Sequence, residues 1–231
     1  MDKDLIKKML DAGVHFGHRT QKWNPKMKPY IYGQRKGIHI FDLEKTYEAL
    51  RKALEFIKKQ VSEGKVVLFV GTKPQALKML AKAALDTGMP YVVHKWIGGL
   101  LTNFDTVKKR IKYLKKLKDE KKSGDFEKYT KKEGVEMSKQ IEKLEAALGG
   151  VQDMTSMPDV LFVVDSIRDD IAVREALKLK IPVIAITDTN ADPTPISYVL
   201  PGNDDAIKSL EFFINEVADA ILEAKKTKKK L

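Results

Sequence analysis

Residues 158–192 read PDVLFVVDSIRDDIAVREALKLKIPVIAITDTNAD, and this stretch decides the fold of the chain. Two apolar runs, 160–164 and 183–186, flank an amphipathic segment whose expected apolar side consists of Ile171, Ala172, Ala176, Leu177 and Leu179. A continuous run rich in β-branched residues is typical of a strand covered on both faces, because neither face meets water. Two such strands joined by a helix predict a right-handed βαβ unit with parallel strands.

Apolar runs and amphipathic segments continue to alternate on both sides of this unit. The expected strands are 37–42, 65–70, 91–94, 160–164 and 183–186, with a further short extended piece at 197–200. The expected helices are a short one over 5–10 that ends at Gly13, then 44–63, 74–86 with Pro74 at its first position, and 204–224. This alternation predicts an α/β fold with a doubly wound parallel sheet of about five strands.

An insertion of different character lies between the third and fourth of these strands. Its apolar residues step by three and four: Phe104, Val107, Ile111, Leu114 and Leu117, then Met137, Ile141, Leu144 and Leu148 on the return. Two such narrow stripes predict an antiparallel helical hairpin in which each helix covers the other's seam. The expected organisation is therefore one α/β domain built from 1–103 and 149–224, a projecting arm at 104–148, and a basic tail at 225–231.

The net charge of +11 is unevenly distributed along the 231 residues. Residues 1–36 carry nine basic and three acidic groups (+6), and residues 104–149 carry fourteen and nine (+5). Residues 150–224 carry five and fourteen (−9). This split favours a polyanionic partner, with nucleic acid ahead of an anionic membrane surface, because no long basic amphipathic helix with bulky aromatics is present.

The N-terminal segment combines basic and aromatic residues, and no acidic residue occurs from Ala12 to Phe41. Basic groups neutralise phosphates, and planar side chains stack on unpaired bases. For Trp23 and Tyr30, packing against the domain remains an equal alternative. The residues assigned to RNA contact, here and near the arm, are His18, Arg19, Lys22, Trp23, Asn24, Lys26, Lys28, Tyr30, Arg35, Lys36, Lys95, Trp96, Asn103, Lys108 and Lys109.

The acidic half is expected to face away from RNA, since phosphates repel like charge within a Debye length of about 8 Å. Asp169, Asp170, Glu175 and Glu211 are expected to be exposed on helices, facing a basic protein neighbour or solvent.

Signatures of catalysis and cofactor binding are weak in this sequence. Neither G-x-x-x-x-G-K-[ST] nor G-x-G-x-x-G occurs, and Gly71-Thr72-Lys73 after a strand fits a plain tight turn better than a phosphate loop. His15 and His18 lack the third ligand of a zinc site. Asp188, Asp204 and Asp205 are weak candidates for a cation site at the carboxyl edge of the sheet, where capping of helices and turns is the alternative.

Several protein classes are excluded by what the sequence lacks. The chain has no cysteine, so a disulfide framework and thiol chemistry are excluded. No apolar run approaches the roughly 20 residues of a membrane helix, and the N-terminus lacks a signal-peptide pattern. A cytoplasmic protein without a cofactor is expected.

Eight blocks of this sequence resemble those of the ribosomal protein two family of the bacterial small subunit. In order, they are Met9–His18 (MLDAGVHFGH), Asn24–Ile31 (NPKMKPYI), Gly37–Leu43 (GIHIFDL), Gly71–Lys73 with Gln75-Ala76, Trp96–Asn103 (WIGGLLTN), Pro158–Pro182, Asp188–Pro193 (DTNADP) and Pro201–Ala206 (PGNDDA). They span nearly the whole chain, and we see no clear departure from the family pattern.

This resemblance implies a flavodoxin-like sheet with a protruding coiled-coil hairpin. It also implies a structural constituent of the small ribosomal subunit, which binds small-subunit ribosomal RNA and neighbouring ribosomal proteins, including ribosomal protein one. No enzymatic activity and no membrane contact are expected. A nucleotide- or sugar-phosphate-binding enzyme of doubly wound fold is the alternative, and it rests only on the sheet and on Gly71-Thr72-Lys73.

Overall fold

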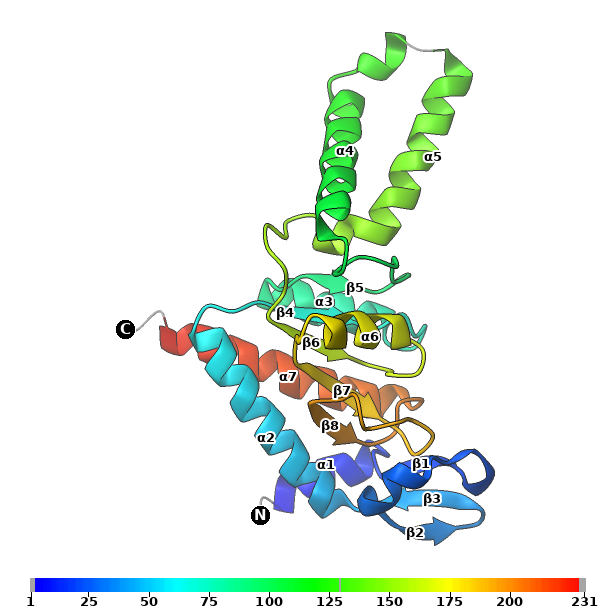
Figure 1. Ribbon diagram of the computed structural model, residues 1–231, viewed down its shortest axis with the longest axis vertical. Coiled ribbons are helices and arrows are strands. Elements are labelled where there is room, and N and C mark those ends of the chain that lie inside the picture. Colours follow the sequence, from blue (N-terminus) through cyan, green and yellow to red (C-terminus); the bar gives the residue numbers. More distant parts are fainter. Residues whose placement is uncertain (1–2, 129, 229–231) are drawn as a thin grey trace.

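The structure, a computed structural model, describes residues 3–128 and 130–228. An α/β domain lies between a small antiparallel sheet and a projecting helical arm, which occupy opposite ends of the long axis (Figure 1). The helices are α1 (Lys3–Asp11), α2 (Leu43–Ser62), α3 (Leu77–Thr87), α4 (Phe104–Lys122), α5 (Lys131–Leu148), α6 (Asp170–Lys178) and α7 (Ile207–Lys228). The strands are β1 (Phe16–Arg19), β2 (Ile31–Arg35), β3 (Ile38–Phe41), β4 (Val67–Val70), β5 (Tyr91–Val92), β6 (Val160–Val163), β7 (Val183–Thr187) and β8 (Tyr198–Pro201).

The larger sheet is parallel throughout and confirms the predicted α/β fold. Its five strands run in the order β5-β4-β6-β7-β8. The strands of the opening stretch pair in register, with Leu161 opposite Val183 and Phe162 opposite Ile184. Because parallel strands need crossover connections, the helices cover the two faces of this sheet.

Alternate residues of each strand enter two separate apolar cores. Phe69 and Phe162 point to one face, where α2, α3 and α7 cover them. Leu68 and Leu161 point to the other face, which is covered by α6, the root of the arm and the loop that precedes it. These side chains are fully buried, which explains why both runs lack polar residues.

The membership of the sheet differs from the prediction in one strand. The segment 37–42 does not join the parallel sheet, because β3 pairs antiparallel with β1 and β2 in a separate three-stranded sheet. The fifth parallel strand is β8, the short extended piece expected at 197–200, which pairs with β7. In β3 only alternate residues are buried, which is the pattern of a strand covered on one face.

The segment 12–36, expected as a basic loop, is largely regular. It contains β1, a 3-10 helix over Pro25–Tyr30 and β2. Asn24 begins this 3-10 helix, and its side-chain oxygen accepts a hydrogen bond from Lys26 N. Lys36 and Gly37, both with positive φ (52° and 76°), turn β2 into β3. Such a pair of residues is typical of a tight two-residue hairpin turn, so Lys36 lies at the tip of this sheet.

Two helices have different bounds from those expected. Pro74 lies in a turn, and α3 begins three residues later at Leu77. The last helix begins at Ile207, after Asn203 Oδ1 has accepted hydrogen bonds from Asp205 N (2.9 Å) and Ala206 N (3.1 Å). It continues to Lys228, so the first part of the expected tail is helical, while 229–231 lie outside the described residues.

The arm projects from the domain, with α4 and α5 running in opposite directions (Figure 1). All five residues of the α4 stripe are buried, whereas in α5 only Ile141 and Leu148 are buried and the other two are partly exposed. The stripe of α4 belongs to the same apolar cluster as Trp96 and Leu101 of the loop that leads into the arm. The two helices therefore pack as a hairpin whose root is joined to the domain core, and a coiled-coil seam remains a prediction.

Two of the four acidic residues expected to be exposed are buried instead. The Asp169 carboxylate accepts hydrogen bonds from Thr72 N (3.0 Å) and Thr72 Oγ1 (2.9 Å). Glu175, on α6, accepts from donors of the loop that precedes the arm. Both expectations were wrong, because helical periodicity does not show which carboxylates meet a loop from another part of the chain. Glu211 is exposed, and Asp170 is partly exposed.

Candidate nucleic-acid interface

The small antiparallel sheet and the 3-10 helices that connect β1 to β2 display the basic residues of the N-terminal segment. All six of the predicted basic residues are exposed: Arg19, Lys22, Lys26, Lys28, Arg35 and Lys36. Lys26 is the one of these six residues that is paired with an acidic group of the described chain. Its Nζ lies 2.8 Å from Asp192 Oδ2 and donates to Thr194 Oγ1 at 3.0 Å. The hydrogen bond from Lys26, with those from Thr194, lowers the pKa of Asp192 to about 2. The other five have no acidic partner within the described chain.

The aromatic residues of this segment divide into packed and exposed side chains. The Trp23 ring lies against the buried ring of His39, with centroids 5.0 Å apart and planes tilted by 40°. Tyr30 is partly buried. Tyr32, on β2, is 81% exposed, and it was not among the residues assigned to RNA contact. Ile31 and Gly33 of β2 are partly buried, whereas Tyr32 between them faces solvent.

The predicted residues near the arm lie in different environments. Lys95, Asn103 and Lys109 are exposed, and the Lys108 ammonium lies 4.7 Å above the ring of Phe104. Trp96 is only 6% exposed, and its indole Nε1 donates to Glu175 Oε1 at 3.1 Å. Its observed contacts are therefore structural. The segment between β5 and α4 and the first turns of α4, which contain these residues, lie at the root of the arm. This root is at the opposite end of the domain from the small sheet (Figure 1).

Carboxylates meet a single buried lysine at the carboxyl edge of the parallel sheet. Lys73 Nζ, which follows β4, lies 2.8 Å from Asp204 Oδ1, 2.7 Å from Asp205 Oδ1 and 3.2 Å from Asp165 Oδ2. Burial disfavours the charged form of Lys73, but its hydrogen bonds to Asp204 and Asp205 raise its pKa above the usual value. Burial, together with repulsion from Asp165 and Asp188, raises the pKa of Asp204 to about 7.

The contacts of Lys73 and Thr72 bear on the alternative of a phosphate-binding loop. The Thr72 amide donates to Asp169, and the Lys73 ammonium is enclosed by three carboxylates. A phosphate would therefore have to displace acidic groups that already hold both donors. This arrangement favours the tight turn over a nucleotide site, as the sequence indicated.

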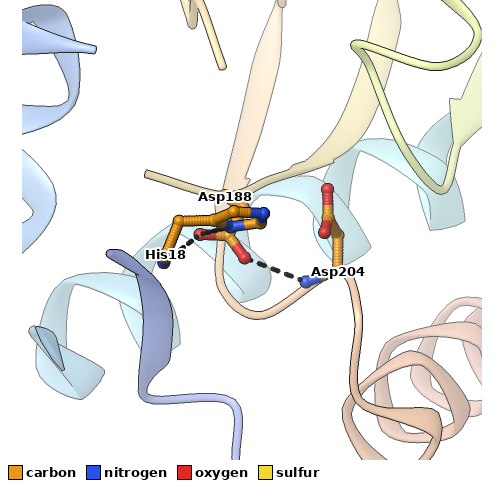
Figure 2. A group of neighbouring side chains, drawn as sticks. All are labelled: His18, Asp188 and Asp204. Carbon is orange, nitrogen blue, oxygen red and sulfur yellow. Dashed lines mark hydrogen bonds and ion pairs between the residues drawn. The ribbon is translucent and has the colours of Figure 1, made fainter. Parts of the chain in front are cut away.

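His18 ties the small sheet to this carboxylate cluster (Figure 2). Its backbone N donates to Thr189 Oγ1 (2.9 Å) and to Asp188 Oδ1 (3.2 Å), and its Nδ1 lies 3.1 Å from Asp188 Oδ1. The hydrogen bond to Asp188 raises the pKa of His18, against the effect of burial. A Cβ at Gly17 would stand 2.5 Å from Thr189 Cγ2, so a glycine permits this close approach. His18 thus acts as a link between the two sheets.

The same group offers a donor set for a cation. One ligand atom from each of His18, Asp188 and Asp204 lies within 4.8 Å of the others (Figure 2). Imidazole and carboxylate are donors that zinc accepts, but a zinc site takes four ligands and Lys73 already supplies positive charge to Asp204. Of the predicted carboxylates, Asp188 and Asp204 belong to this group, while Asp205 lies 3.5 Å from His18 Nε2.

Comparisons with known proteins agree over nearly the full length of the chain. A family model described as ribosomal protein S2 matches residues 9–224. A relative from Dictyoglomus thermophilum named small ribosomal subunit protein uS2 is 51% identical over 226 residues, covering 98% of this chain and 92% of the relative. Relatives of the same name from Nitratiruptor sp. (50% identical; 95% and 82% covered) and Bdellovibrio bacteriovorus (51%; 98% and 72%) are similar. Among the helices of the described chain, none has the length and apolarity needed to cross a membrane.

Proposed function

Since this chain belongs to the ribosomal protein S2 family and is a structural constituent of the small ribosomal subunit, we propose that its N-terminal antiparallel sheet contacts small-subunit ribosomal RNA. The family is structural, so the chain is not an enzyme, and its location is the cytoplasmic ribosome. Ribosomal RNA and ribosomal proteins are its partners. Which residues make those contacts is the subject of the proposal.

The observation that carries the proposal is an unneutralised positive surface. Arg19, Arg35 and Lys36 lie on the strands and the hairpin turn of the small sheet, and Lys22 and Lys28 lie on the 3-10 helices that connect β1 to β2. All five are exposed and have no acidic partner within the described residues. Positive charge that the protein does not neutralise itself is available to phosphates. Tyr32 on the same sheet adds a planar side chain that can stack on an unpaired base.

Replacing Arg19, Lys22 and Lys28 with alanine is expected to weaken binding to small-subunit ribosomal RNA and to flatten its salt dependence. If each residue contacts one phosphate, the slope of log K against log salt falls by about 2 to 3. The measurement is a filter-binding titration at several salt concentrations. The matched control replaces Lys59, Lys78 and Lys82, which are equally exposed on α2 and α3. Equal losses in both variants would contradict a specific contact by the small sheet.

We also propose that a neighbouring ribosomal protein, ribosomal protein one, docks along α6. The family resemblance supports this partner, and α6, together with the turn before it that contains Ile167, carries apolar side chains that the chain itself leaves uncovered. Ile167, Ile171 and Leu177 are 47%, 46% and 54% exposed. Uncovered apolar side chains beside polar groups are typical of protein contact surfaces.

A photo-crosslinking residue at Ile171 is expected to capture ribosomal protein one in intact small subunits. The same residue at Leu85 on α3, which is also exposed, serves as the control. Crosslinks from position 171 to ribosomal RNA alone would show that α6 faces RNA, and the docking surface would then have to lie elsewhere.

A further inference from the structure

The two helices of the arm differ sharply in charge. Helix α4 carries nine basic and three acidic residues (+6), whereas α5 carries four of each (0). The acidic residues of α4 lie near its ends, at Asp105, Asp119 and Glu120. Residues 106–118 therefore contain seven basic groups and no acidic group, over about 20 Å of helix at about 1.5 Å per residue.

The apolar contacts of the arm leave these basic groups on its surface. The buried stripe of α4 turns toward α5 and the domain core, so the charged residues occupy the remaining sides of the helix. Three of the nine basic residues of α4 pair with acidic groups: Lys115 with Asp153, Lys116 with Glu120, and Lys118 with Glu145.

A second set of α4 residues remains available to a partner. Lys109, Arg110, Lys112 and Lys121 are exposed and have no acidic partner within the described residues. On α5, by contrast, the four lysines are interspersed with four glutamates along the helix, so the electrostatic fields of the two sets of charges largely cancel.

From this asymmetry we infer that the exposed basic face of α4 is the phosphate-binding surface of the arm and contacts ribosomal RNA, while α5 does not. The inference deepens the proposed function, since it rests on ribosomal RNA being the partner. Here "the α4 face" means Lys109, Arg110, Lys112 and Lys121.

The composition of the α4 face fits a nucleic acid better than other polyanions. The centres of protein interfaces are depleted of lysine and rich in apolar anchors, but the only large apolar side chain exposed on α4 is Tyr113, at 44%. A membrane surface would need a free apolar face, and that of α4 is buried. A line of lysines, an arginine that can grip one phosphate with two N–H groups, and a planar tyrosine match a phosphodiester backbone.

The test compares two full-length variants with four neutralised charges each. One carries Lys109→Gln, Arg110→Gln, Lys112→Gln and Lys121→Gln on α4. The other carries Lys131→Gln, Lys132→Gln, Lys139→Gln and Lys143→Gln on α5, where the lysines are equally exposed. Glutamine keeps the helix propensity close to that of lysine, and melting curves check that both variants fold. Binding to protein-free small-subunit ribosomal RNA is measured across a range of salt concentrations.

In the α4 variant the slope of log K against log salt is expected to become shallower by about 3, and in the α5 variant by less than about 1. Equal losses in the two variants would overturn the inference, because the arm would then act only through its total charge. An unchanged slope in the α4 variant would also overturn it. If the alanine variant of the small sheet still weakens binding in that case, the proposed function stands while the inference falls. If neither variant changes binding, both fall.

A probe on intact subunits gives an independent readout. Because the natural chain has no cysteine, a single cysteine at Asp119 on α4 or at Glu142 on α5 can carry a tethered hydroxyl-radical source. Both positions are exposed. Cleavage of ribosomal RNA is expected to be stronger from position 119, and stronger cleavage from position 142 would show that the arm presents α5 to RNA instead.

Discussion

Glu175→Ala is expected to lower the free energy of unfolding by at least about 3 kcal/mol, although it changes a residue that the sequence places on an amphipathic helix. The buried carboxylate accepts hydrogen bonds from Trp96 Nε1 (3.1 Å), Gly99 N (2.7 Å), Leu101 N (3.0 Å) and Thr102 N (3.1 Å). Each buried donor left without a partner costs about 1–3 kcal/mol, and these costs add only in part.

The pH dependence of this contribution has a definite sign. Burial acts to raise the pKa of Glu175, but the hydrogen bonds from Thr102, Trp96, Gly99 and Leu101 outweigh it and leave the pKa below the usual value. A carboxylate with a lowered pKa stabilises the folded state above its unfolded pKa, and this stabilisation is lost as the pH falls through the folded pKa. The difference between wild type and variant should therefore shrink in acid.

Urea unfolding followed by far-UV circular dichroism measures this prediction. The control is Glu211→Ala, which removes an exposed glutamate from α7 and should change the stability by no more than about 0.5 kcal/mol. Similar effects for the two glutamates would contradict a stabilising role for the hydrogen bonds that Glu175 accepts from the loop before the arm. A variant that loses stability but keeps the Trp96 indole proton resonance unchanged would also contradict it.

Lys73→Met is expected to cost about 3–5 kcal/mol at pH 8, because it leaves several carboxylates at the sheet edge without their cation. Asp165, Asp204 and Asp205 all lie within 3.2 Å of Lys73 Nζ. Burial and neighbouring carboxylates already raise the pKa of Asp204, and without the lysine this pKa should rise further. The pKa of Asp205, which Lys73 helps to lower, should rise as well, so the folded variant takes up protons as the pH falls. The stability of the variant relative to wild type should therefore recover between pH 8 and pH 5.

Chemical denaturation at several pH values tests this prediction. Adding Asp204→Asn to Lys73→Met removes one of the uncompensated charges and should restore part of the lost stability at pH 8. A loss that does not depend on pH, or a double variant less stable than Lys73→Met alone, would show that Lys73 acts through packing rather than charge.

The charge distribution along the chain illustrates how far sequence reasoning reaches here. Residues 150–224 carry −9, and this charge predicts an acidic surface. In the structure several of these acidic groups face basic residues from the first half of the chain: Lys26 with Asp192, Lys58 with Glu223, Lys73 with Asp165, Asp204 and Asp205, and Lys115 with Asp153. Part of the acidic half therefore neutralises the basic half.

The candidate RNA-binding residues also divide into those whose environment the sequence predicts and those whose environment depends on distant parts of the chain. The exposure of Arg19, Lys22 and Lys28 agrees with their placement in an acid-free segment, because isolated basic residues remain hydrated. Trp96 and Lys26 could not be judged from their neighbours in sequence, since their partners Glu175 and Asp192 lie 79 and 166 positions away. The exposure of Tyr32 was also not predicted, because which face of β2 the domain covers is decided by the tertiary structure.

The apolar runs by themselves determined the parallel sheet and the helical arm, because burial on two faces or on one helical stripe imposes a period that is visible locally. Only the tertiary structure decided that β3 belongs to the small antiparallel sheet and that β8 is the fifth strand of the parallel sheet. A short strand pairs with whichever sheet edge is within reach. The tertiary structure alone also decided which carboxylates are buried. Hydrogen bonds and ion pairs form between groups that are close in space, and the separation of two residues in the sequence does not indicate how far apart they lie in the structure.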